Sequence, residues 1–171
     1  MDGWIVRKRT RLKDYDYSQA GCYFVTICVK DMLERLGIVV VGDGVLDVPC
    51  VQLFKYGEIT EKHIVAINTH YSNLSVVKHV VMPNHVHMII SIGEGVDDKR
   101  GKSIKRTSPA NATIPALISS LKRFIHKECG FILFQRSYHD HIIRNDAEYK
   151  DIAEYIDNNP LRWKEDCFYP R

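Results

Sequence analysis

The sequence lacks the features that mark membrane proteins and secreted proteins. None of its apolar runs approaches the roughly 18 residues that a membrane-spanning helix needs. The N-terminal residues, Met-Asp-Gly-Trp-Ile-Val-Arg-Lys-Arg, do not follow the basic, apolar and small-residue order of a signal peptide. We therefore expect a cytoplasmic protein that has no membrane partner.

Cysteine is present, but not in the patterns that build disulfide frameworks or zinc sites. The five cysteines are odd in number, and no two of them form a Cys-x-x-Cys pair. We expect all five to be reduced. A structural zinc domain would need more cysteine ligands at suitable spacings, so this class of protein is not favoured.

A strong excess of positive charge is also missing, because the formal net charge is only +3. The distribution of the charge is more informative than its sum. Residues 7–13 contain five basic residues, and residues 99–106 contain five more. One such run is more often a solvated segment than a binding site, but two runs together with a basic helix face favour a polyanionic partner. The candidate DNA-contacting residues are Arg7, Lys8, Arg9, Arg11, Lys122, Arg123 and Lys127.

Hydrophobic periodicity predicts a mixture of strands and helices. Strands are predicted at residues 23–29, 75–82, 85–92 and 132–143, and helices at 60–70, 113–129 and 145–159. Glycines at 42 and 44 predict a β-hairpin within residues 37–53. This order favours an α+β fold, an antiparallel sheet with helices on one face, like the ferredoxin or RNA-recognition sandwich, with an inserted β-hairpin. We expect a single domain over residues 1–171, with a basic N-terminal arm over about 1–20 and a flexible basic loop over about 93–111.

A His-Val-His sequence opens the third predicted strand. Residues two apart on a strand point to the same face, so His85 and His87 would lie side by side while Val86 enters the core. Two imidazoles in that position can bind one divalent metal ion. An isolated His-x-His pair more often has a structural role. The Pro83-Asn84 turn favours the metal site here, because it fixes the pair at a strand start.

The last predicted helix carries Tyr155 and Asn159, which share a face because they are four residues apart. That face adjoins Ile152 and Ile156, so it should point toward the sheet. A single tyrosine beside an apolar stripe is usually a core residue. An amide one turn later, in a chain that also has His-Val-His, shifts the balance toward a functional role.

Together these patterns resemble those of the REP-associated tyrosine transposases, within the single-tyrosine HUH transposases of bacterial insertion sequences. The resemblance runs over nearly the whole chain and is carried by short blocks. These blocks are residues 11–17, 21–28, 56–59, 81–87, 135–145 and 155–163. A match of several blocks in order is far more specific than a His-x-His pair alone.

The resemblance implies a metal-dependent enzyme that nicks and rejoins single-stranded DNA during transposition. Tyr155 would attack a DNA phosphate and hold the 5′ end as a phosphotyrosine. His85, His87 and Asn159 would bind Mg²⁺ or Mn²⁺; many members have glutamine where this chain has Asn159. The implied partner is hairpin or palindromic-repeat DNA, with no small-molecule cofactor. The protein would be a monomer or a homodimer associated with the nucleoid.

A protein that binds nucleic acid without catalysis is the main alternative. Such a domesticated relative would tolerate the loss of the nucleophile or of a metal ligand, and this chain has lost neither. The chain also lacks the Lys/Arg-Gly-Phe-type signature of an RNA-recognition strand. The second His-x-His pair, His139 and His141, stays open between a residue supporting the metal ligands, a DNA contact and an ordinary surface position.

Overall fold

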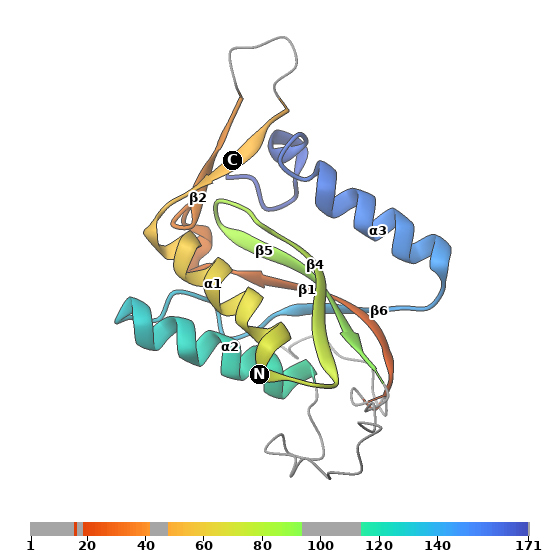
Figure 1. Cartoon of the computed structure of the whole chain (residues 1–171). Helices are drawn as coiled ribbons and strands as arrows, with labels where there is room; N and C mark the ends of the chain where they lie inside the picture. The colour runs from red at the N-terminus through yellow and green to blue at the C-terminus, as the bar shows by residue number, and fades with distance from the viewer. Residues whose placement is uncertain (1–15, 17–18, 42–47, 94–113, 171) are drawn as a thin grey trace, which may run out of the picture.

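A four-stranded antiparallel sheet organises the chain. In this computed structural model, residues 16, 19–41, 48–93 and 114–170 are described. The strands lie in the order β4-β5-β1-β6, and each is antiparallel to its neighbours (Figure 1). Their bounds are Gly21–Cys28 for β1, Leu74–Val81 for β4, His85–Ile92 for β5 and His139–Ile143 for β6.

In the described part of the chain, three α-helices, a small hairpin and two short 3-10 helices, η1 (Lys30–Met32) and η2 (Trp163–Glu165), complete the element order. The helices are α1 (Lys55–His70), α2 (Ile114–Cys129) and α3 (Asp146–Asn158), and the hairpin pairs β2 (Gly37–Val40) with β3 (Cys50–Leu53). The sequence β1-α1-β4-β5-α2-β6, with the strand order above, is the ferredoxin-like βαββαβ arrangement. The predicted α+β class, the antiparallel sheet and the inserted hairpin are therefore confirmed. The predicted hairpin tip around residues 42–44 lies outside the described residues.

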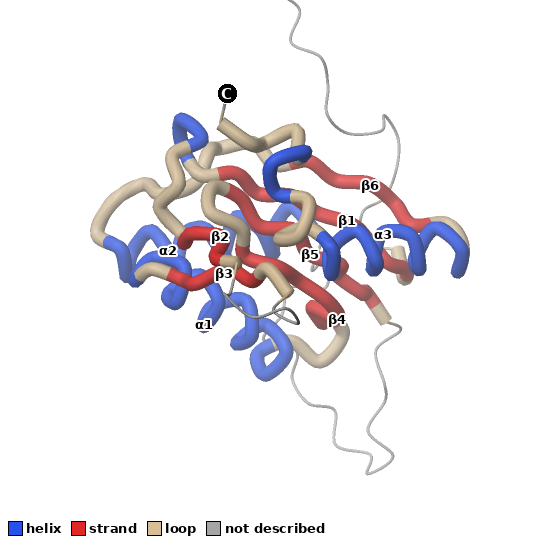
Figure 2. Tube along the Cα trace, turned by 90° about the horizontal axis from the view of Figure 1, so that it is seen from above, coloured by secondary structure: helices blue, strands red, loops and turns tan. Residues whose placement is uncertain are grey.

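The sheet has an apolar layer on each face. On one face, alternate residues of β1 and β5 pack beneath α1 and α2; they include Tyr23, Val25, Ile27, Val86, Met88 and Ile90. On the other face, Ile89 and Ile143 pack with Ile156 of α3. The prediction of helices on one face holds for α1 and α2, whereas α3 covers the opposite face (Figure 2). The reason is that both central strands carry apolar side chains on this second face too, which need a cover.

Local contacts explain where the observed elements differ from the predicted ones. The first helix begins at Lys55, five residues before the prediction, because its first turn packs against the end of the hairpin. A Cβ atom on Gly57 would lie 2.0 Å from the carbonyl oxygen of Leu36, so only glycine allows this approach. The last helix begins as predicted, with the Asn145 side chain accepting a hydrogen bond from the Glu148 backbone N–H at 2.9 Å.

Of the predicted DNA-contacting basic residues, the structure describes only the three on α2. Arg7, Lys8, Arg9 and Arg11 of the predicted N-terminal arm lie outside the described residues, and so do residues 94–111 of the predicted basic loop. On α2, Arg123 and Lys127 are exposed. Lys122 is only 7% exposed, and its placement on a basic surface was wrong. None of the described helices is long and apolar enough to cross a membrane.

The buried side chain of Lys122 holds the segment that leads into β6 through hydrogen bonds. Its ammonium group donates to the backbone carbonyls of Gln135 at 2.7 Å and Ser137 at 2.8 Å. Burial lowers the pKa of Lys122 to about 8. These contacts use the carbonyls that a strand would need, so the predicted strand at 132–143 is reduced to β6, and Phe134 forms only an isolated bridge with Val29.

We predict that Lys122→Ala lowers the free energy of unfolding by about 3 kcal/mol, because it leaves buried carbonyls without a donor and opens a cavity. Lys127→Ala, on the exposed side of the same helix, should change it by no more than about 0.5 kcal/mol. Urea unfolding of both variants measures the difference. Equal stability of the two variants would contradict the internal role of Lys122.

Candidate functional site

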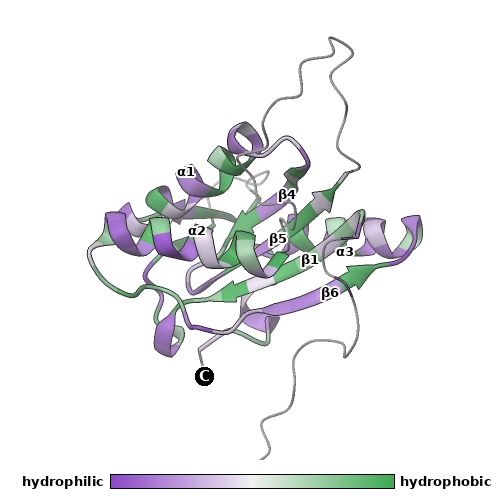
Figure 3. Cartoon of the chain, turned by 90° about the horizontal axis from the view of Figure 1, so that it is seen from below, coloured by the Kyte–Doolittle hydropathy of each residue, from purple (hydrophilic) through white to green (hydrophobic). Residues whose placement is uncertain are grey.

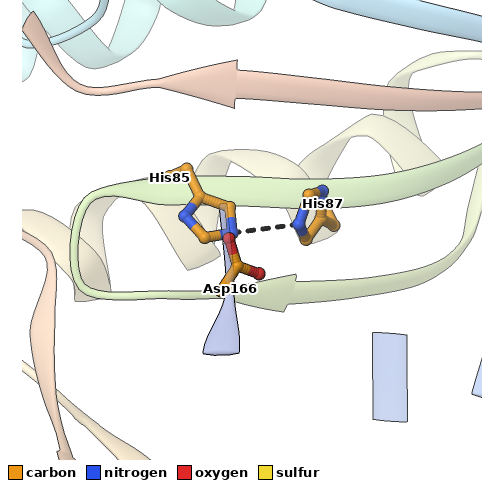
Figure 4. Close-up of side chains that lie close together, drawn as sticks. All are labelled: His85, His87 and Asp166. Carbon is orange, nitrogen blue, oxygen red and sulfur yellow. Dashed lines mark hydrogen bonds between the residues drawn. The ribbon is translucent and has the colours of Figure 1, made fainter. Parts of the chain in front are cut away.

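Two buried histidines stand side by side at the start of β5. His85 is 0% exposed and His87 is 1% exposed, and both project to the face covered by α3, while Val86 lies in the core on the other face. Their Nε2 atoms are 2.9 Å apart (Figure 4). The strand alternation expected from the sequence therefore brings the two imidazoles together.

The outer nitrogen of each imidazole is held by a neighbouring polar side chain. The Asn84 amide donates to the backbone carbonyls of Met32 and Phe168, so its oxygen faces His85 and accepts from Nδ1 at 2.9 Å. A carbonyl oxygen only accepts, so Nδ1 of His85 carries the hydrogen and Nε2 presents a lone pair. The Thr26 hydroxyl lies 2.7 Å from Nδ1 of His87. Such partners behind an imidazole are typical of metal-binding histidines.

Asp166 is the site residue that sequence reasoning missed. It follows the short 3-10 helix η2 (Trp163–Glu165) and lies over the histidine pair (Figure 4). Possible ligand atoms of His85, His87 and Asp166 all lie within 4.8 Å of one another. The segment after Pro160 has no hydrophobic periodicity, so the only sequence signal was a carboxylate a few residues beyond Tyr155 and Asn159.

Asn159 contributes an amide to the same group. Its nitrogen donates to Oδ2 of Asp166 at 2.9 Å, whereas its oxygen is buried without a hydrogen-bond partner among the described residues. A buried carbonyl oxygen without a partner is costly unless a donor or a cation is supplied. Two imidazoles, a carboxylate and an amide oxygen form a mixed donor set that fits a divalent ion such as Mn²⁺ or Mg²⁺.

The hydroxyl of Tyr155 lies at the edge of this group. It is 3.2 Å from Nε2 of His87 and donates to Oδ2 of Asp166, also at 3.2 Å. The residue is 40% exposed, and its ring contacts His87 and, edge-on, Phe24. Tyr155 is thus both fixed at the histidines and accessible from outside. Tyr138, the other tyrosine near a His-x-His pair, is buried in the core beneath α1 and α2.

Burial determines the protonation of these groups. It lowers the pKa of His85 from 6.5 to about 4, with Asp166 acting in the opposite direction. Burial, and then the neighbouring His85, hold the pKa of His87 well below its usual value. Burial and the Asp166 carboxylate raise the pKa of Tyr155. Both imidazoles are therefore neutral at pH 7, which is the form that binds a metal ion.

Of the other residues considered, Trp163 lies next to the histidine pair, whereas the basic residues of α2 lie on the opposite face of the sheet. Arg123 and Lys127 belong to α2, on the face of the sheet opposite to Tyr155. His141 forms an ion pair with Glu148 at 2.6 Å, whereas His139 is exposed on β6. Trp163 is buried, and its ring centre is 5.8 Å from that of His85, so it closes one side of the group.

We predict that the metal-free protein loses stability as the pH falls from about 6.5 toward 4. In that range the unfolded chain takes up protons at His85 and His87 and the folded chain does not, so protons favour unfolding. The free energy of unfolding should fall by up to about 1.4 kcal/mol per pH unit for each histidine. Urea unfolding in the presence of a chelator measures this slope. His85→Gln should reduce the slope, and an unchanged slope would contradict the assignment.

The comparisons with known proteins agree with this architecture. No protein-family model matches the chain. An uncharacterized protein of Haemophilus influenzae is 32% identical over 174 residues, which cover 95% of this chain and 93% of the relative. A structure of a REP-associated tyrosine transposase bound to a REP hairpin superposes with a TM-score of 0.60. The two chains are 19% identical, and the match covers 90% of this chain and 73% of the transposase. The chain thus belongs to the same family as the Haemophilus influenzae protein, and its fold is that of the REP-associated tyrosine transposase.

Proposed function

We propose that the protein nicks and rejoins single-stranded DNA through a covalent bond between Tyr155 and a 5′-phosphate. The observation that carries this proposal is the position of the Tyr155 hydroxyl, 3.2 Å from His87 and 3.2 Å from Asp166 in a group suited to a divalent ion. The REP hairpin bound by the structural neighbour supports a DNA hairpin as the substrate. The sequence resemblance to the same transposase family supports the same reaction.

His85, His87 and Asp166, together with the buried oxygen of Asn159, would hold Mg²⁺ or Mn²⁺. When bound, such an ion offsets the negative charge that develops on a phosphate during displacement and orients the phosphate for attack. It also explains the placement of Asp166, whose carboxylate disfavours ionisation of Tyr155. A cation held next to Asp166 would offset this negative charge, and the same carboxylate would then no longer oppose ionisation of the phenol.

The residues of the chain then account for each step of the cleavage. The Tyr155 oxygen forms a bond to phosphorus while the bond from phosphorus to the 3′ oxygen breaks. The phenol proton moves to Oδ2 of Asp166, which already accepts the hydrogen bond from the hydroxyl. The leaving 3′ oxygen takes up a second proton from a donor other than Tyr155, so the products are a 5′-phosphotyrosine and a free 3′-hydroxyl. Because the phosphotyrosine conserves the energy of the phosphodiester bond, a 3′-hydroxyl can reverse the step and rejoin DNA.

We predict that Mn²⁺ binding depends on the buried residues His87 and Asp166 and not on exposed histidines. Isothermal titration calorimetry of His87→Ala and Asp166→Ala should show at least a tenfold weaker affinity than the unmodified protein, since even partners of ligands contribute about 10- to 100-fold. His141→Ala is the matched control, because His141 is exposed and paired with Glu148. Unchanged Mn²⁺ affinity in both site variants would remove the proposed metal site.

We predict that the protein forms a covalent adduct with DNA and that Tyr155→Phe abolishes it. The substitution removes one oxygen and keeps the ring against Phe24 and His87, so the fold should persist. The assay uses labelled hairpin oligonucleotides from the DNA that flanks the gene, with Mn²⁺, followed by denaturing electrophoresis. Tyr138→Phe is the control and should retain the adduct. An adduct that persists in Tyr155→Phe would contradict the nucleophile, and no adduct in the unmodified protein would favour the non-catalytic DNA-binding alternative.

A further inference from the structure

The surroundings of Tyr155 limit the direction from which DNA can approach. Helix α3 carries five acidic residues and one lysine, and Asp151 and Glu154 beside Tyr155 are exposed. This outer side of α3 repels a phosphate backbone. On another side, the rings of Trp163 and Phe168 lie 5.8 and 4.6 Å from His85. Next to Thr26 of β1 and His139 of β6, the cover is the Phe168 ring, whose centre lies 6.3 Å from that of His139.

A polar row crosses the sheet beneath the Phe168 ring. His87 on β5 is opposite Thr26 on β1, and Thr26 is opposite His139 on β6. Residues that pair in this way point to the same face, so the three side chains form one line across the sheet. Since neighbouring strands are about 4.8 Å apart, His139 lies about 10 Å from His87 along this row. β6 is the edge strand, and most of it is hydrophilic (Figure 3). His139 at its start is exposed.

The Phe168 ring fills the space between His87 and His139, which therefore has room for one planar group. The ring centre of Phe168 is 6.0 Å from that of His87 and 6.3 Å from that of His139. A phosphodiester placed there, instead of the Phe168 ring, would have Tyr155 and His87 on one side and His139 on the other. This is the arrangement that an in-line displacement requires, with the attacking and leaving oxygens on opposite sides of phosphorus.

On the basis of the proposed strand-nicking function, we propose that His139 is the proton donor for the leaving 3′ oxygen. As the Tyr155 oxygen bonds to phosphorus and the phosphorus–3′ oxygen bond breaks, a ring N–H of protonated His139 passes its proton to the 3′ oxygen. The imidazole becomes neutral and the product is a 3′-hydroxyl. In the rejoining step, neutral His139 takes the proton from the attacking 3′-hydroxyl. Histidine is the side chain most often used for such proton transfers.

His141 differs from His139 in its contacts and serves as a matched control. It points to the same face of β6, two residues further along the strand, opposite Phe24. Its Nε2 lies 2.6 Å from Glu148, whose other carboxylate oxygen accepts from the Arg144 backbone N–H. His141 is thus tied to the first turn of α3, away from the row that contains His87 and Thr26. Of these two histidines, only His139 is therefore assigned as the proton donor at the cleaved bond.

The test uses a hairpin oligonucleotide, from the DNA flanking the gene, in which sulfur replaces the 3′ oxygen at the cleaved linkage. A thiol is far more acidic than an alcohol, so the sulfur leaves without a proton donor. Single-turnover adduct formation should be at least about 100-fold slower for His139→Gln on the oxygen substrate. On the sulfur substrate, His139→Gln should match the unmodified protein within a few-fold. His141→Gln should behave like the unmodified protein on both.

Three results would overturn the proposal, and they can be told apart. Equal slowing of His139→Gln on both substrates would make His139 a positioning residue, and fluorescence anisotropy would show whether DNA affinity has fallen. No slowing on the oxygen substrate would remove any role for His139 in cleavage. Failure of the unmodified protein to form an adduct on either substrate would overturn the strand-nicking function, and this proposal with it.

Discussion

The contact between two imidazole nitrogens at the start of β5 determines how the rest of the site is built. These Nε2 atoms are buried and 2.9 Å apart, and Nε2 of His85 presents a lone pair, so a hydrogen on Nε2 of His87 or a cation must face it. The surrounding groups suit the proposed cation, which would take the place of this hydrogen. Asn84 orients His85, Thr26 lies against the outer nitrogen of His87, and burial disfavours protonation of both rings. Asp166 and the amide oxygen of Asn159 add the hard ligand atoms that imidazoles alone do not supply.

The ferredoxin-like sheet makes the contact between the two imidazoles possible because one of its faces packs in the core and the other carries the histidines. One face of β5 enters the core beneath α1 and α2, which fixes the strand, and the other face presents the histidines. Helix α3 is added after the βαββαβ unit and packs on the histidine face through Ile156. The same helix therefore covers the second apolar layer and places Tyr155 beside the two histidines.

Much of this arrangement could be predicted from the sequence, because local periodicity encodes it. The alternation in His85-Val86-His87, the four-residue spacing of Tyr155 and Asn159, and the cap at Asn145 all depend on neighbours along the chain. The missed features depend on contacts between distant segments. Lys122 sits on the polar side of its helix by spacing, yet the segment at 135–137 folds over it. Asp166 lies in an irregular segment, and only the folded chain brings it to the histidines.

The acidic outer side of α3 has a consequence for the form of DNA that can reach Tyr155. A double helix laid across the site would bring phosphates of its second strand close to exposed residues such as Asp151 and Glu154. A single strand is thin and flexible, so it can follow β1 and β6 without meeting that surface. Under the proposed function, helix α3 would then act as an electrostatic filter between duplex and unpaired DNA, and selectivity for strandedness would come from charge repulsion outside the group around Tyr155.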